Sequence, residues 1–189
     1  GGTGMISSAG IQFITPERRA RKAGNLEAVM EEISLIKTET KDGLVGINVM
    51  RAIERDYDET IAGAIEAKID FIVVSAGSPL HLPKAVGNND IALIPKISSL
   101  RALEVICKCW EKKYGRRPDA VIVEGDMAGG HLVFDFAELV RPTVADSRER
   151  FLTIFNPIKD FAQKHGDFPV IPTGGIFDHQ DIRWWDEHG

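Results

Sequence analysis

Short runs of apolar, often β-branched residues alternate along the chain with longer segments in which apolar residues recur every three or four positions. The short runs are typical of buried strands, and the wider spacing is typical of amphipathic helices. Regular alternation of the two predicts a parallel sheet whose strands are joined by helices. Six strands are expected, over residues 3–7, 44–49, 71–75, 92–95, 120–124 and 169–173.

Polar residues with short side chains precede the segments of helical spacing. Their oxygens can accept hydrogen bonds from the first free amides of a helix, so they mark the expected helix starts. One such residue, Asp146, stands three residues before Glu149, a spacing that resembles a capping box. The expected caps or first residues are, in chain order, Asn25, Asp58, Ser98 or Ser99, Asp146 and Asp178.

The spacing between predicted strands indicates the size of the complete fold. From residue 44 onward, one strand and its following helix take about 31 residues, and eight such units need about 250, the usual size of a (β/α)₈ barrel. The chain holds about six units. We therefore expect an α/β fold, a TIM (β/α)₈ barrel that is incomplete here, forming one domain over residues 1–189 as a fragment of a longer chain. An open α/β sheet is the alternative.

Composition excludes several classes of protein. The 189 residues are 43% hydrophobic and 27% charged, as in ordinary globular proteins. Acidic residues outnumber basic ones by 28 to 23, so no nucleic-acid partner is expected. The longest apolar runs are about six residues, whereas a membrane span needs roughly 20. Cys107 and Cys109 stand two apart in a predicted helix and face different sides, which favours reduced thiols and a cytoplasmic location.

Polar or glycine-rich residues follow the predicted strands, and ligands of parallel α/β folds bind at those carboxyl ends. Lys96 after the fourth strand can hold an anionic group or simply reach solvent. Gly174 and Gly175 follow the last strand and precede a helix, so their amides can approach a phosphate with help from the helix dipole. The alternative is that the two glycines only form a tight turn.

The loop from Glu124 to His131 is rich in glycine and carries one imidazole above the predicted sheet. An imidazole with a pKa near 6.5 can take or give a proton at neutral pH, so His131 is the best candidate for a general base. A purely structural histidine is the alternative. No HExxH motif, Cys/His cluster, phosphate-binding Walker loop, complete dinucleotide fingerprint or G-x-S-x-G elbow is present, so we expect no metal, Rossmann dehydrogenase or serine hydrolase.

Several segments together resemble one known family. They are Gly-Gly-Thr-Gly-Met-Ile at the start, Gly46-Ile47-Asn48, Val74-Ser75-Ala76-Gly77-Ser78-Pro79, Pro95-Lys96-Ile97-Ser98, Glu124-Gly125 with Ala128-Gly129-Gly130-His131, and Pro172-Thr173-Gly174-Gly175-Ile176. In this order they resemble the nitronate monooxygenase (2-nitropropane dioxygenase-like) flavoproteins, a family that includes FMN-dependent enoyl-acyl-carrier-protein reductases.

The resemblance implies a barrel that holds FMN at the carboxyl ends of its strands, with His131 as the catalytic histidine. Lys96 is then expected beside the pyrimidine part of the flavin, Asn48 bonded to the ring, and the two glycines after the last strand bound to the phosphate. The cofactor-binding residues implied are Asn48, Ser75, Lys96, Glu124, Gly129, Gly130, Gly174 and Gly175. The chain departs from the family in lacking its first and eighth strands and in having Leu132-Val133-Phe134 where many members have a glycine.

The expected activity is that of an FMN-dependent oxidoreductase of the nitronate monooxygenase type. It oxidises alkyl nitronates or nitroalkanes with O₂ and uses His131 as base. One alternative is an enoyl-acyl-carrier-protein reductase that uses FMN with NADH or NADPH as reductant. Another is a barrel without redox activity that binds a phosphorylated small molecule. The expected partners are a small-molecule substrate and a second copy in a homodimer.

Overall fold

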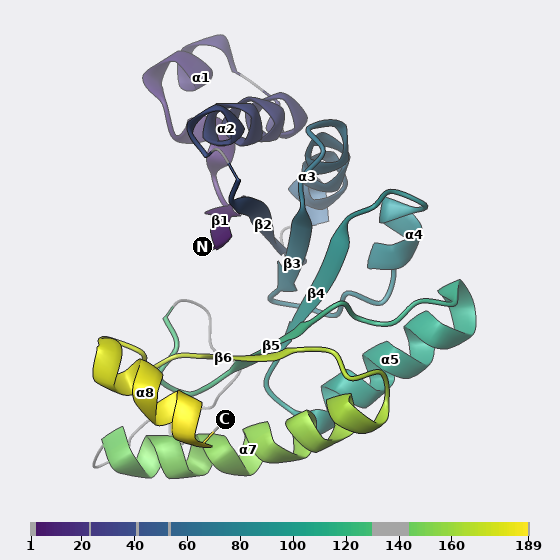
Figure 1. The fold of residues 1–189 in the computed structure, drawn as a ribbon. Coiled ribbons are helices and arrows are strands. Elements are labelled where there is room, and N and C mark those ends of the chain that lie inside the picture. The colour runs from purple at the N-terminus through teal and green to yellow at the C-terminus, as the bar shows by residue number, and fades with distance from the viewer. Residues whose placement is uncertain (1–2, 23, 41, 53, 130–143, 189) are drawn as a thin grey trace. The chain divides into compact units, whose positions relative to one another are not determined.

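The computed structural model describes residues 3–22, 24–40, 42–52, 54–129 and 144–188, and for residues 54–55 and 144–146 it describes the backbone alone. Six parallel strands are hydrogen-bonded in chain order, each to the next (Figure 1). They are β1 (Thr3–Ser7), β2 (Leu44–Met50), β3 (Phe71–Ser75), β4 (Ala92–Ile97), β5 (Val121–Glu124) and β6 (Val170–Thr173). All six predicted strands are therefore confirmed.

The described chain divides into two compact units. Unit 1 is Gly1–Pro95 with Cys109–Pro118, and unit 2 is Lys96–Lys108 with Asp119–Gly189. Strand β4 and helix α5 (Leu100–Tyr114) each contribute residues to both units. The prediction of a single domain over residues 1–189 stays a prediction.

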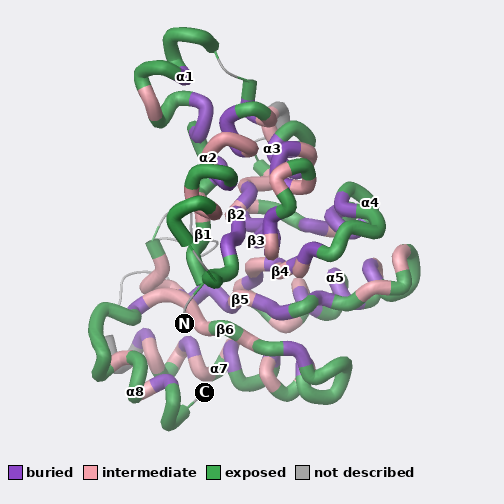
Figure 2. Tube along the Cα trace, turned by 45° about the horizontal axis from the view of Figure 1, so that its top comes forward, coloured by how far each residue is buried: buried purple, intermediate pink, exposed green. Residues whose placement is uncertain are grey.

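In unit 1, strands β1 to β3 and the first part of β4 pair in parallel. Alternate residues of β2 point to opposite faces, and Val45, Ile47 and Val49 are all buried on one of them. Figure 2 shows the buried stretches along β2 and β3. The helices of this unit are η1 (Ile11–Phe13), α1 (Pro16–Arg21), α2 (Asn25–Glu39), α3 (Glu54–Glu66) and α4 (Leu82–Val86), and α2 packs beside α3.

In unit 2, the end of β4 pairs with β5, and β5 pairs with β6. Helices α7 (Val144–Lys164) and α8 (His179–His188) lie next to each other (Figure 1). Their contact is aromatic: Trp185 of α8 stands edge-on to Phe151 and Phe155 of α7, with ring centroids 5.1 and 5.2 Å apart. These three buried rings fasten the two helices together.

Three of the predicted helix starts are confirmed and two are wrong. Ser99 Oγ accepts a hydrogen bond from Ala102 N, and Asp178 Oδ1 accepts from Gln180 N at 2.7 Å. Asn25 is the first residue of α2, one position after the capping residue Gly24. Two others lie inside their helices, because the chain enters the helix earlier than the polar residue suggests; they are Asp58 in α3 and Asp146 in α7.

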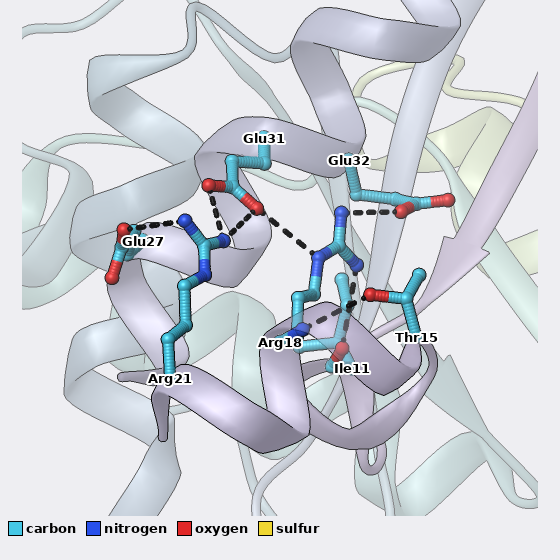
Figure 3. A network of polar contacts seen from close by, with 7 residues as sticks. All are labelled: Ile11, Thr15, Arg18, Arg21, Glu27, Glu31 and Glu32. Atoms are coloured by element: carbon cyan, nitrogen blue, oxygen red, sulfur yellow. Dashed lines mark hydrogen bonds and ion pairs between the residues drawn. The ribbon is translucent and has the colours of Figure 1, made fainter. Parts of the chain in front are cut away.

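Sequence reasoning missed helix α1, although its start carries a recognisable signal. Thr15 Oγ1 accepts from Arg18 N at 3.2 Å, and Pro16 occupies the first helical position. Arg18 is 5% exposed and pairs with Glu31 and Glu32 of α2, at 3.2 and 2.9 Å (Figure 3). This network ties the short helix α1 to the long helix α2.

Candidate functional site

Lys96 and Glu124 share one face of the strands in unit 2. Lys96 is in register with Ile122 of β5, two residues before Glu124. Because successive side chains alternate between faces, Lys96, Ile122 and Glu124 point to the same side. The prediction that Lys96 follows the fourth strand is corrected in one respect, because β4 continues to Ile97 and includes it.

The two charges form an ion pair between Lys96 Nζ and Glu124 Oε1. The Glu124 side chain is 5% exposed and the Lys96 side chain is 22% exposed. A carboxylate so deeply buried needs a cation beside it, and Lys96 supplies one. An ammonium group has three N–H donors, so Lys96 retains donors for an anionic or electron-rich group at this end of the strands.

The Gly174–Gly175 turn packs against the loop that follows β5. Both glycines have positive φ, 101° and 69°. A Cβ on Gly174 would lie 2.6 Å from the backbone nitrogen of Ala128, and one on Gly175 would lie 3.1 Å from Met127 Sδ. Backbone conformation and close packing both require glycine here, so the tight-turn interpretation accounts for the residue types.

The amides of the turn have no acceptor in the part of the chain that the structure describes. No described residue accepts a hydrogen bond from the backbone nitrogens of Gly174, Gly175 or Ile176. The first amides of α8 are not available, because Asp178 Oδ1 accepts from Gln180 N and Asp181 N. The expectation that a helix dipole directly behind the glycines assists binding is therefore corrected: α8 begins at His179 and is capped by carboxylates.

A small pocket adjoins this turn in unit 2. Its walls come from the loop after β5, from α7, from the glycine turn and from α8; the lining residues are Gly125, Asp126, Met127, Ser147, Arg148, Phe151, Gly174, Gly175 and Trp185. Sequence reasoning missed Asp126 and Arg148. The sequence around Arg148 carries no signal that this residue lines a pocket with Gly174, which lies 26 positions later in the chain.

Unit 1 holds the other two predicted residues. Asn48 is in register with Ser7 of β1 and Val73 of β3, and its Oδ1 is buried and accepts no hydrogen bond from the described residues. Ser75 is buried at the end of β3, where its carbonyl oxygen accepts from Arg51 N at 2.9 Å. The unpaired carboxamide oxygen of Asn48 is suited to a ligand N–H or O–H.

The remaining predicted residues are at the edge of the described chain or beyond it. Gly129 is exposed and is the last described residue before residue 144, whereas Gly130 and His131 lie outside the described residues. Across the described ranges, no group of three or more His, Cys, Asp or Glu residues is placed to hold a metal ion. None of the helices in those ranges combines the length and apolar character needed to span a bilayer.

Comparison with known proteins gives one family. The model of the nitronate monooxygenase family matches residues 22–184. No curated protein matches the chain significantly.

Solved structures with the same fold include three proteins from different bacteria. FabK from Thermotoga maritima is 21% identical over 87% of this chain and 44% of its own, with a TM-score of 0.64. A nitroalkane oxidase from Streptomyces ansochromogenes is 16% identical over 100% of this chain and 56% of its own, with a TM-score of 0.66. The enoyl reductase domain of MlnA comes from the macrolactin biosynthesis cluster of Bacillus amyloliquefaciens. It is 15% identical over 100% of this chain and 51% of its own, with a TM-score of 0.54.

The chain spans about half the length of each of these structures. Their likeness establishes the fold, which is that of an incomplete α/β barrel as predicted. Because the family model covers most of the sequence, this chain belongs to the nitronate monooxygenase family.

Proposed function

We propose that this chain belongs to an FMN-dependent oxidoreductase that oxidises alkyl nitronates or nitroalkanes with O₂. The observation that carries the proposal is the family match, since residues 22–184 contain every expected site residue, from Asn48 to Gly175. A cytoplasmic location and a homodimer are proposed with it. Cys107 and Cys109 are thiols and not halves of a disulfide, which supports the location.

The residues present fit FMN. The amides of Gly174, Gly175 and Ile176 have no acceptor among the described residues, as suits a phosphate, and the Asn48 carboxamide oxygen has no donor, as suits a ring N–H. A bound FMN would supply the redox chemistry, the transfer of electrons from the substrate to dioxygen.

In this proposal the residues of this chain bind and orient the flavin, and one of them moves a proton of the substrate. Lys96 would supply positive charge to the pyrimidine part of a bound flavin, and Glu124 holds the Lys96 ammonium in place. His131 removes the proton from the carbon that bears the nitro group.

A spectrum of the purified full-length protein tests the proposal. We expect flavin absorbance, or its appearance after FMN is added, and bleaching of that absorbance when an alkyl nitronate is mixed in without oxygen. Full-length protein that is colourless and takes up no FMN would instead favour a barrel that binds another phosphorylated small molecule.

A second candidate is an enoyl-acyl-carrier-protein reductase that uses FMN with NADH or NADPH. The specific observation in its favour is the shared fold with the MlnA enoyl reductase domain. Anaerobic mixing with each reduced nicotinamide separates the two activities. Rapid bleaching by NADH or NADPH supports the reductase, and bleaching by the nitronate alone supports the oxidase.

The role of His131 has its own test, the substitution His131→Ala. We expect the variant to bind FMN like the original protein and to lose about 10²- to 10⁴-fold in turnover of a neutral nitroalkane, because it lacks the general base. Turnover of the preformed nitronate, which has already lost that proton, should change far less. Unaltered turnover of the neutral nitroalkane would remove His131 from the mechanism.

A further inference from the structure

A pocket of about 340 Å³ lies in unit 1, between residues of η1, α1, α2 and α3. Pockets that hold small molecules are usually about 300 Å³ or more, so this one has room for a metabolite. Its walls carry charges of both signs. Arg19 and Lys22 come from α1 and its C-terminal cap, and Asp56 and Glu59 come from α3. An ion of one sign would be repelled by one wall, whereas a ligand with both charges suits the two together.

The cations of this pocket are not used up by the protein. Arg18 also lines it, but the nitrogens of its guanidinium are bonded to two glutamates of α2 and to a backbone carbonyl (Figure 3). The side chains of Arg19 and Lys22 are exposed and pair with no described residue. Beside them α2 begins after Gly24, which has no side chain to cap the first amides. Uncapped amides next to two cations favour a carboxylate.

Other residues of the pocket are acceptors without donors. Asn25 and Gln12 are 4% and 9% exposed, and their carboxamide oxygens accept from no described residue. The Asn25 amide is fixed in this orientation, because its Nδ2 donates to the carbonyl oxygen of Asp56 at 3.1 Å and to Thr60 Oγ1. These unpaired negative ends add to the charge of Glu59, which is exposed and has no partner among the described residues. Such surroundings favour an ammonium group, which carries three N–H donors.

We propose that this pocket binds the zwitterion of an α-amino acid with an apolar side chain. Its carboxylate would lie at the start of α2 near Arg19 and Lys22, and its ammonium group near Glu59. The apolar side chain follows from Phe13, whose ring is 57% exposed and lines the same pocket, because covering that ring removes apolar surface from water. The inference goes beyond the proposed function and uses none of the expected FMN-binding residues.

Calorimetric titration of the full-length protein with L-phenylalanine tests the proposal, at about pH 6, where α-amino groups are charged. Two analogues separate the charges: N-acetyl-L-phenylalanine lacks the ammonium group, and L-phenylalaninamide lacks the carboxylate. We expect L-phenylalanine to bind about tenfold or more tightly than either analogue, the usual difference for a charged hydrogen bond. No binding of L-phenylalanine, or equal binding of all three compounds, would overturn the proposal whether or not the protein binds FMN.

Two substitutions assign the charges to their walls. We expect Lys22→Met to weaken binding of L-phenylalanine about tenfold and to leave that of L-phenylalaninamide unchanged. We expect Glu59→Gln to weaken binding of L-phenylalanine by a similar factor and to leave that of N-acetyl-L-phenylalanine unchanged.

Each substitution has a matched control in unit 1. Lys68→Met changes another exposed lysine with the same left-handed backbone, φ 54° against 53° for Lys22. Glu66→Gln changes another exposed glutamate of α3. We expect neither control to alter the affinity for L-phenylalanine. If Lys22→Met and Glu59→Gln weaken binding no more than their controls, the amino acid does not bind in this pocket and the inference is wrong.

Discussion

Lys96 and Glu124 are opposite charges on neighbouring strands, and the buried member is the acid. Because the Glu124 side chain is 5% exposed, its carboxylate depends on Lys96 for compensation. We expect Lys96→Met to lower the free energy of unfolding by about 3 kcal/mol, measured by urea denaturation. The double variant Lys96→Met with Glu124→Gln should recover part of that loss, since no buried charge is then left unpaired.

Lys108→Met provides the comparison for this experiment, because Lys108 is exposed on α5. A change within about 0.5 kcal/mol is expected there. If Lys96→Met loses no more stability than Lys108→Met, Lys96 does not compensate the buried charge of Glu124.

Gly174 offers a second prediction at the scale of one residue. A methyl group there would meet the backbone nitrogen of Ala128 at 2.6 Å, and backbone cannot rotate away as a side chain can. We expect Gly174→Ala to lower the free energy of unfolding by about 2 to 3 kcal/mol in denaturant titrations.

Gly10→Ala is the comparison for Gly174→Ala, because it measures the free-energy cost of backbone strain without that of a steric clash. Gly10 has a φ of 71°, and a methyl group on its Cα would meet no atom within 4 Å. Strain alone costs about 1 kcal/mol. Similar losses in the two variants would mean that the loop after β5 moves aside at little cost.

At the scale of elements, α1 is held to α2 by arginine–glutamate pairs. The pKa of Glu31 lies below its ordinary value of 4.5, chiefly because Arg21 hydrogen-bonds to its carboxylate and also because of Arg18. A lowered pKa in the folded state stabilises the protein at a pH above the ordinary value, and this stabilisation is lost as the pH falls through the folded value.

We therefore expect the free energy of unfolding to decrease on acidification below a pH of about 4.5, and Arg21→Met to flatten that decrease. Urea titrations across a series of pH values measure both. Arg19→Met, which changes an exposed arginine of the same helix, should leave the slope as it is. If the Arg21→Met protein keeps the original pH dependence, Arg21 is not the main cause of the lowered pKa of Glu31.

At the scale of the whole molecule, binding of FMN should appear as added stability. A ligand that binds only the folded state at a hundredfold excess over its Kd raises the free energy of unfolding by about 2.7 kcal/mol. We expect an increase of this size with FMN in urea titrations of the full-length protein. An unfolding midpoint that does not respond to FMN would contradict flavin binding.

The strands were predictable because their signal is local. A run such as Phe71–Ser75 is apolar at all but its last position and is buried at every position, so composition alone marks it. Helix starts were harder. Asn25 looks like a cap, but its side chain reaches across to Thr60 Oγ1 of α3. That bond joins residues 35 positions apart and overrides the local preference.

The sequence by itself determined the order of the strands along the chain, the polar residues at the strand ends and the resemblance to one family, because each depends on residues adjacent in the chain. Only the tertiary structure decided which of those residues meet. It paired Lys96 with Glu124, pressed Gly174 against Ala128, and brought Arg148 to the glycine turn. Contacts between residues far apart in the chain arise from packing of strands and helices, so no short pattern records them.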